Sequence, residues 1–237
     1  SGPRGFLWRA LALREASFPG MPVTESLFTH VEGARRLDGM GLFPWDGAPY
    51  PVDDAALHHV FPGGWIWVLR FGNGVTSVGV VATRPLAERL RLAEGAPAWE
   101  RLLDELPTVA AQLRGARPVR PFRHLPRVAF RSGAVTGPGW TLLPSAAAFV
   151  DPLLSTAFAL TLLGVERIAR AIEEEWGTPR LEARLAAHGR ATLLEADATS
   201  RLMAALHATF TRFELFSGLS LLYFAAASYA ETVRRLG

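Results

Sequence analysis

The stretch LPSAAAFVDPLLSTAFAL, residues 143–160, contains one charged residue, Asp151, in a run of small and aliphatic side chains. A buried carboxylate costs free energy unless a partner satisfies it, so Asp151 belongs either to a surface turn or to a site. The pattern predicts a strand at residues 139–145, which leads through Asp151-Pro152 into a helix that runs from Leu154 to Glu175.

Small residues at this junction would let a ligand approach the first backbone N–H groups of the helix, where the helix dipole favours negative charge. Ala146, Ala147 and Ala148 permit the close approach, and Ser155 with Thr156 suits the entry to the helix. An ordinary buried strand-turn-helix, in which Asp151 only caps the turn, explains the same residues equally well.

The composition is that of a globular protein with one large domain or two small ones. The chain has 237 residues, 49% hydrophobic and 20% charged, and we find no internal repeat. The absence of cysteine excludes disulfides and thiolate chemistry and fits a reducing compartment, so we expect a cytoplasmic protein. All 25 basic residues are arginine, so no lysine amine is available for chemistry.

A membrane or nucleic-acid partner is not expected. The apolar run at residues 215–230 lies between Glu214 and Glu231 and is shorter than the ~20 residues that a spanning helix needs. The first residues, Ser-Gly-Pro, show no signal peptide, although a start without Met means that a targeting segment could have been lost. Only the basic pI speaks for nucleic acid.

A β-hairpin is the clearest local prediction. The β-rich runs at residues 57–71 and 75–83 are joined by Gly-Asn-Gly, and residues 23–31 form a further strand before a loop rich in proline and glycine. Helical spacing at residues 85–92 and 98–113 predicts short helices that cover the sheet.

The remaining segments complete a mixed α/β class. Residues 114–131 carry six arginines and no acid, and we interpret them as a solvated connector rather than a site for phosphate or an acidic carrier protein. From Thr178-Pro179 the chain is expected to be helical to Leu236, with breaks near Gly189 and Gly218.

The opening stretch resembles the second flavin-contact motif of the flavin-dependent halogenases and their aromatic-hydroxylase-like relatives, in which Gly-Asp-Ala-Ala precedes Asp-Pro and Ser-Thr-Gly. Three further segments resemble that family in the same order: SGPRG at residues 1–5, GWIWVLRFGNGVTSVGVV at 64–81 and LYFAAASYAETVRRL at 222–236. The G-x-G-x-x-G unit of the family does not occur in this chain, so the resemblance implies part of a larger flavoprotein that is inactive in isolation.

The resemblance implies four regions: the end of an FAD-binding segment at 1–22, an antiparallel β-sheet substrate domain with a helical insertion at 23–132, the distal FAD-binding strand and helix at 133–176, and a helical C-terminal region at 177–237. It implies FAD as cofactor, a small-molecule substrate, and possible flavin reductase and halide partners. The implied cofactor-binding residues are Gly2, Ser145, Ala146, Ala147, Asp151, Pro152, Ser155, Thr156 and Ala157, with halide expected beside the last two.

Two departures from the family motif concern the cofactor. The acidic residue of Gly-Asp-Ala-Ala is replaced by Ser145, and the glycine of Ser-Thr-Gly is replaced by Ala157, which adds a methyl group where the backbone would approach the flavin. The resemblance places the halogenating lysine of the family in a part that precedes the segment seen here, so hydroxylation and halogenation both stay open.

An aromatic strand supplies the expected substrate contacts. Trp65 and Trp67 lie on one face of their strand and would stack on an aromatic substrate, with His59 beside them for proton transfer. Packing in the core and an ordinary sheet histidine are the alternatives. His58 and His59 point to opposite faces, so no metal site is expected. The sequence singles out no catalytic residue, nucleophilic triad or phosphate loop.

Two functions therefore stand side by side. The first is an FAD-dependent oxidoreductase, either halogenase or monooxygenase, that uses reduced flavin and oxygen on an organic substrate. The second is a catalytically silent module that binds a hydrophobic ligand or a protein.

Overall fold

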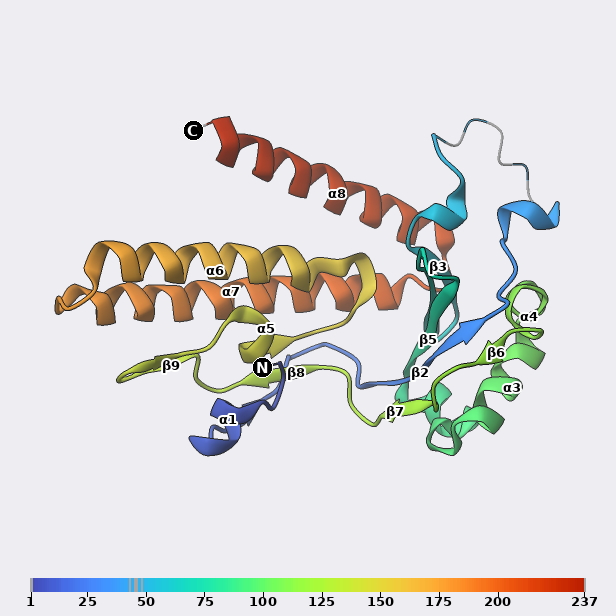
Figure 1. Ribbon diagram of the computed structural model, residues 1–237, viewed down its shortest axis with the longest axis horizontal. Helices are drawn as coiled ribbons and strands as arrows, with labels where there is room; N and C mark the ends of the chain where they lie inside the picture. The colour runs from blue at the N-terminus through green and yellow to red at the C-terminus, as the bar shows by residue number, and fades with distance from the viewer. Residues whose placement is uncertain (1, 43, 45–46, 48, 237) are drawn as a thin grey trace. The chain divides into compact units, whose positions relative to one another are not determined.

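The computed structural model describes residues 2–42, 44, 47 and 49–236, which form two compact units (Figure 1). The first, here called the helical unit, consists of Ser1–Met21 and Val128–Gly237. The second, the sheet unit, is the intervening Pro22–Arg127. The sheet unit is thus inserted into the helical unit, and the two together show the mixed α/β class expected from the sequence.

The sheet unit contains a six-stranded antiparallel sheet in the order β3-β4-β5-β2-β6, with β7 also paired to β2. The strands are β2 (Thr24–Glu32), β3 (Leu57–Phe61), β4 (Gly64–Arg70), β5 (Val75–Thr83), β6 (Arg117–Pro118) and β7 (Arg123–Leu125). The predicted hairpin of β4 and β5 is confirmed, and its turn is closed by the Asn73 side chain, which accepts the Val75 N–H at 3.1 Å. The interpretation of residues 114–131 as a connector was wrong in part, because β6 and β7 pair with β2.

Three short helices pack on one face of this sheet: α2 (Arg84–Leu90), α3 (Ala96–Glu105) and α4 (Pro107–Leu113). The 3-10 turns of the unit are η1 (Asp38–Met40), η2 (Val52–Asp54) and η3 (Leu92–Glu94). Buried Leu27, Ile66 and Val80 from the sheet meet buried Leu102 from α3 in one core. The helix expected at 98–113 ends at Glu105, because Pro107 keeps the residue before it out of helical geometry.

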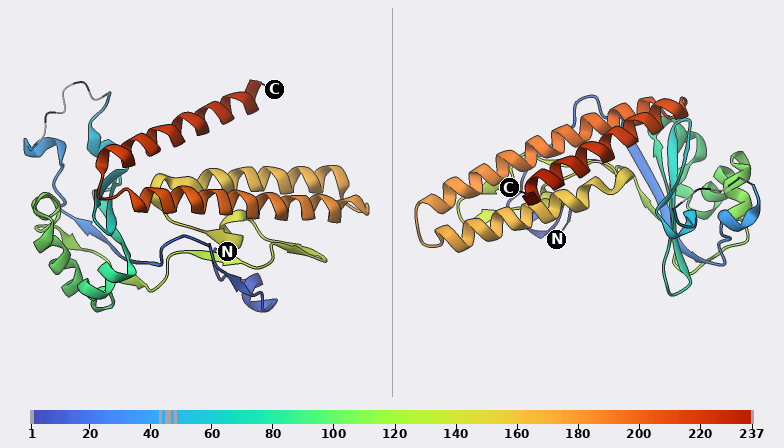
Figure 2. Two further views of the ribbon diagram at one scale, coloured as in Figure 1. Left: turned by 180° about the vertical axis from the view of Figure 1, so that it is seen from behind. Right: turned by 90° about the horizontal axis from the view of Figure 1, so that it is seen from above.

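The helical unit combines a long helix pair with small sheets. Its helices are α1 (Phe6–Ala10), α5 (Pro144–Ala147), α6 (Thr156–Glu175), α7 (Arg180–Ala208) and α8 (Phe213–Leu236), with a 3-10 turn η4 (Leu153–Ser155). Its strands are β1 (Glu15–Ala16), β8 (Phe130–Ser132), β9 (Thr136–Gly137), β10 (Trp140–Thr141) and β11 (Ala148–Phe149), arranged as β1-β8-β11 and β9-β10. Figures 1 and 2 show α6 and α7 side by side along their length.

Two predictions of the sequence are corrected in this unit. The strand expected at 139–145 is only two residues long, because Pro144 opens the helical turn α5. The breaks expected near Gly189 and Gly218 do not occur, and the chain turns instead between α7 and α8, after Ala208. Gly189 serves close packing: a Cβ there would lie 3.0 Å from the Thr136 methyl group.

Helix α8 is longer than the apolar run from which it was predicted. By length and composition it could cross a membrane, and only 6% of its apolar window is buried within the structure. One helix of this kind is weak evidence for a span, so the absence of a membrane partner stays a prediction.

Candidate functional site

The junction between β11 and α6 adopts an unusual backbone. Leu154 (φ 59°, ψ 12°) and Ser155 (φ 53°, ψ 26°) are both left-handed. A residue with a Cβ costs roughly 1–2 kcal/mol in this region, and two in succession require that the surrounding structure hold them. The strained turn places Ser155 as the N-cap of the 20-residue helix α6, and its hydroxyl makes no capping hydrogen bond there.

The Asp151 side chain stabilises this turn through a hydrogen bond to its backbone. Its side chain is fully buried; one carboxylate oxygen accepts the Leu153 N–H at 2.9 Å and the other accepts from Nε2 of His207 at 3.0 Å. A carboxylate only accepts hydrogen bonds, so Nε2 of His207 carries the proton. Asp151 is therefore both the cap of the turn and one half of a buried acid–histidine pair.

His207 is the residue that sequence reasoning missed. It lies at the end of α7, 56 residues from Asp151, and no local pattern links the two. Its ring packs against Phe210, with centroids 4.5 Å apart, and its Nδ1 has no hydrogen-bond partner among the described residues. The hydrogen bond from Nε2 to Asp151 is thus the polar contact that the His207 ring makes among the described residues.

Close packing fixes α5 against α6. A Cβ at Gly164 would lie 2.3 Å from Cγ of Pro144, so only glycine lets the proline approach α6 this closely. The contact positions the Ser145-Ala146-Ala147 segment, in which Ala147 is fully buried. The segment expected at the end of a strand therefore lies in a helical turn.

Five of the nine predicted cofactor-binding residues line one of two pockets. Ser145, Thr156 and Ala157 line a pocket of about 30 Å³, which holds one or two water molecules. Gly2 and Ala146 line a second pocket of about 150 Å³. Ala147, Asp151 and Pro152 line neither, and Ser155 is exposed at the helix start.

The size of these pockets bears on the fit of FAD. Neither pocket encloses a ring system, so these residues would form one wall against which a flavin lies, not a closed site. Trp8 lines the second pocket, and its indole Nε1 is buried without a hydrogen-bond partner among the described residues. Ala157 has right-handed helical geometry, so its extra methyl group causes no backbone strain.

The expected grouping of His59 with the tryptophans needs correction. Trp65 and Trp67 share the sheet face away from α2–α4, with ring centroids 5.7 Å apart. His58 is the histidine on that face, 5.0 Å from Trp65. The sequence correctly put the two histidines on opposite faces, but which one faced the tryptophans depended on the register of β3 with β4.

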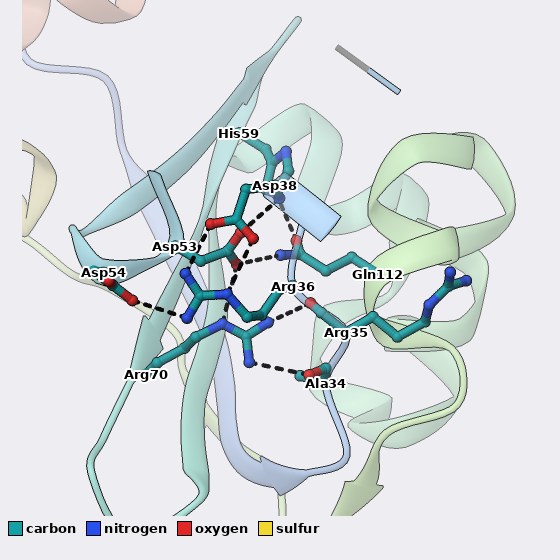
Figure 3. Close-up of polar contacts among 9 residues, drawn as sticks. All are labelled: Ala34, Arg35, Arg36, Asp38, Asp53, Asp54, His59, Arg70 and Gln112. Carbon is teal, nitrogen blue, oxygen red and sulfur yellow. Dashed lines mark hydrogen bonds and ion pairs between the residues drawn. The ribbon is translucent and has the colours of Figure 1, made fainter. Parts of the chain in front are cut away.

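His59 belongs instead to a buried polar network in the sheet unit (Figure 3). Its Nε2 lies 2.9 Å from Oε1 of Gln112, whose amide nitrogen donates to Asp53 at 3.3 Å. Burial lowers the pKa of His59, and the hydrogen bond to Gln112 and the charge of Asp53 only partly oppose that effect. His59 therefore lies on the sheet face opposite Trp65 and Trp67, and its ring contacts Gln112.

Asp53 is the centre of the network. Its carboxylate accepts from Nε of Arg70 at 3.0 Å and from the Asp38 N–H at 2.9 Å, and its side chain is fully buried. Arg70 also donates to the carbonyl oxygens of Ala34, at 3.0 Å, and Arg35. These contacts tie the segment after β2 and the turn η2 to the sheet, as Figure 3 shows, so the network is a structural one.

A metal site is not found among the described residues: no three histidine or acidic side chains come together there in a way that could hold an ion.

No protein-family model matches the chain, but comparison with known proteins finds halogenases as its sequence relatives. Tetracycline 7-halogenase of Kitasatospora aureofaciens is 35% identical over 169 residues, which are 68% of this chain and 30% of that protein. Monodechloroaminopyrrolnitrin halogenase PrnC of Pseudomonas fluorescens is 30% identical over 174 residues, 71% of this chain and 30% of that protein. The chain thus spans about a third of the length of these relatives.

Solved structures share the fold. Halogenase PltM in complex with phloroglucinol and FAD superposes with a TM-score of 0.80 at 23% identity and covers 94% of this chain, which corresponds to 46% of that protein. CmlS, a flavin-dependent halogenase, gives a TM-score of 0.67 at 21% identity, over 92% of this chain and 38% of that protein. The mixed α/β fold therefore matches part of these structures.

Proposed function

Because the chain belongs to the flavin-dependent halogenase family, we propose that it supplies the distal flavin wall and the substrate sheet of an FAD-dependent halogenase or monooxygenase. The observation that carries the proposal is the strained turn at Leu154-Ser155, which presents the start of α6 beside Ser145 and the pocket of Thr156 and Ala157. In this proposal residues 1–22 and 133–176 contact FAD, and residues 23–132 contact the substrate.

Bound FAD would supply the redox chemistry, in which reduced flavin and oxygen oxidise a halide or the substrate itself. The contribution of this chain is electrostatic and steric. The first N–H groups of α6 lack intrahelical partners and favour negative charge on the ligand that faces them. Leu153 and Ala147 are both fully buried, so these apolar side chains exclude water from the protein interior next to the turn.

The substrate proposal concerns the aromatic face of the sheet unit. The indole ring of Trp67 packs against Gly79, where a Cβ would be 2.3 Å from the ring, and its Nε1 donates to Ser77 Oγ at 3.1 Å. The half-buried Trp67 thus offers a fixed ring for stacking. PltM was solved with an aromatic molecule, phloroglucinol, which makes a phenolic compound the first substrate to test.

A silent binding module is the second candidate, and the surface of α8 favours it. Leu221, Leu222, Phe224 and Tyr229 are all at least half exposed, which is typical of a face that another molecule covers. The two functions differ in whether flavin binds at all.

The test is a turnover assay on the complete gene product with FAD, a flavin reductase, oxygen and phloroglucinol, with and without chloride or bromide. A halide-dependent mass increase in the product supports halogenation, and an added oxygen without halide supports hydroxylation. A protein that binds FAD but yields neither product would contradict catalysis on this substrate class, and a protein that binds no flavin would favour the silent module.

A further inference from the structure

We propose that His207 is a positioning residue for the flavin wall: through Asp151 it holds the left-handed Leu154-Ser155 turn in the shape that presents the start of α6. The consequence for flavin rests on the proposed function, whereas the mechanical link between His207 and the turn is a property of this chain alone. Nothing in the spacing of the sequence points to this residue.

The contacts form a continuous chain from α7 to the turn. Nε2 of His207 donates to Asp151 at 3.0 Å, and the other oxygen of Asp151 accepts the Leu153 N–H at 2.9 Å. Leu153 immediately precedes the two left-handed residues, and the Ser155 N–H donates to the Pro152 carbonyl at 3.1 Å. The carboxylate therefore fixes the first residue of the turn, and His207 fixes the carboxylate.

Burial makes this link strong. The side chains of His207 and Asp151 are 3% and 0% exposed, so in the folded structure neither partner is in contact with bulk water. Hydrogen bonds to a buried charged group are stronger than neutral ones, and an unpaired buried carboxylate is costly. Without His207, Asp151 would turn toward water or another donor, and the strained turn would relax.

The orphaned Nδ1 of His207 supports a positioning role. A buried nitrogen without a hydrogen-bond partner costs free energy. A histidine at this position is therefore less stabilising than an apolar side chain unless the Nε2 contact compensates. The Phe210 ring, tilted by 40° with its centroid 4.5 Å away, packs against the imidazole and restricts its orientation toward Asp151. The ring is thus held to make this single contact.

The test compares His207→Gln with His207→Asn. The glutamine amide nitrogen occupies nearly the position of Nε2 and keeps the donor to Asp151, whereas the asparagine nitrogen matches Nδ1 and leaves Asp151 unpaired. His188→Asn is the matched control, because His188 is a buried histidine of the same helix that contacts the Leu142 carbonyl at 3.0 Å and not Asp151.

The first readout is hydrogen exchange in peptides that cover residues 150–156 of the complete gene product without ligand. We expect exchange of the Leu153 amide to rise about ten-fold or more in His207→Asn, relative to global unfolding, and to stay near wild type in His207→Gln and His188→Asn. Equal exchange in His207→Asn and wild type would overturn the proposal, whether or not the protein binds flavin.

The second readout is the FAD dissociation constant from flavin absorbance. We expect it to rise about ten-fold in His207→Asn and to be restored in His207→Gln. If the wild type binds flavin and His207→Asn binds it equally well, the positioning role is contradicted while the proposed function stands. If the wild type binds no flavin, the proposed function fails and the exchange readout alone decides the mechanical link.

Discussion

Asp53 and Asp151 are both fully buried carboxylates, and each is held by a basic side chain from a distant segment. Arg70 lies 17 residues from Asp53, and His207 lies 56 residues from Asp151. The apolar neighbours of Asp151 drew attention to it in the sequence, whereas Asp53, between Val52 and Asp54, had no such distinguishing surroundings. Partners at such separations become visible only in three dimensions.

Removal of the Asp53 charge should destabilise the sheet unit. In Asp53→Asn the buried Arg70 contact loses its anionic partner and the Asp38 N–H keeps at most a neutral acceptor, so we expect the free energy of unfolding to fall by roughly 2–4 kcal/mol. Urea denaturation measures the loss. Asp54→Asn, at a half-exposed carboxylate, is the control and should change stability by less than about 1 kcal/mol; an equal loss in both variants would contradict the network.

Stability should fall in acid because of His59. Its pKa is lowered from the ordinary value of 6.5 by burial, so below pH 6.5 the unfolded chain binds a proton that the folded chain does not, and the free energy of unfolding decreases as pH falls. His59→Gln removes this titration and should flatten the decline below about pH 7. Burial also lowers the pKa of His188 in the helical unit, so part of the decline will remain.

The result that would contradict this account is a pH dependence of unfolding that is identical in wild type and His59→Gln across the same range.

At the scale of elements, glycines in helices play different roles. Gly164 in α6 and Gly189 in α7 touch neighbouring elements, whereas a Cβ at Gly218 in α8 would meet nothing within 4 Å. From the sequence, Gly189 and Gly218 were both predicted to break a helix. Helix propensity describes the glycine itself and contains no information on the residues that pack against it.

The alanine variants of these glycines should therefore diverge. We expect Gly164→Ala to lower the free energy of unfolding by roughly 1–3 kcal/mol, since its methyl group would lie 2.3 Å from Pro144 and push α5 from α6. Gly218→Ala should be neutral or stabilising by up to about 1 kcal/mol. Thermal unfolding with calorimetry distinguishes them, and a stabilised Gly164→Ala would show that α5 does not pack as described.

Local signals predicted their elements well. The hairpin of β4 and β5 follows from Asn-Gly between two runs with strand character, and α6 follows from its spacing after Asp151-Pro152. The short α5 and the strands β6 and β7 were missed, because each exists only through contact with a distant segment: α5 with Gly164, and β6 and β7 with β2.

At the scale of the whole molecule, the sheet unit is inserted between two segments of the helical unit. Within the helical unit, Gly2 and Ala146 line the same pocket although they are far apart in the sequence. Only the family resemblance indicated this from the sequence. The resemblance also named the start of α6, but neither the left-handed geometry of Leu154-Ser155 nor the support from His207 could be inferred from it.

The central claim is that the start of α6 forms a flavin wall, and Ala157→Asp tests it most directly. A carboxylate in the first turn of a helix is compatible with the helix dipole, so α6 should keep its structure, but its charge would oppose the negative charge of a flavin at this place. Ala183→Asp, at an exposed position in the first turn of α7, is the matched control.

The measurement is a flavin absorbance titration of the complete gene product and both variants, with circular dichroism to verify that their helix content is equal. The account predicts that wild type and Ala183→Asp bind FAD with similar dissociation constants and that Ala157→Asp binds about ten-fold or more weakly. Equal binding by Ala157→Asp and wild type, or no binding by any of the three, would contradict it.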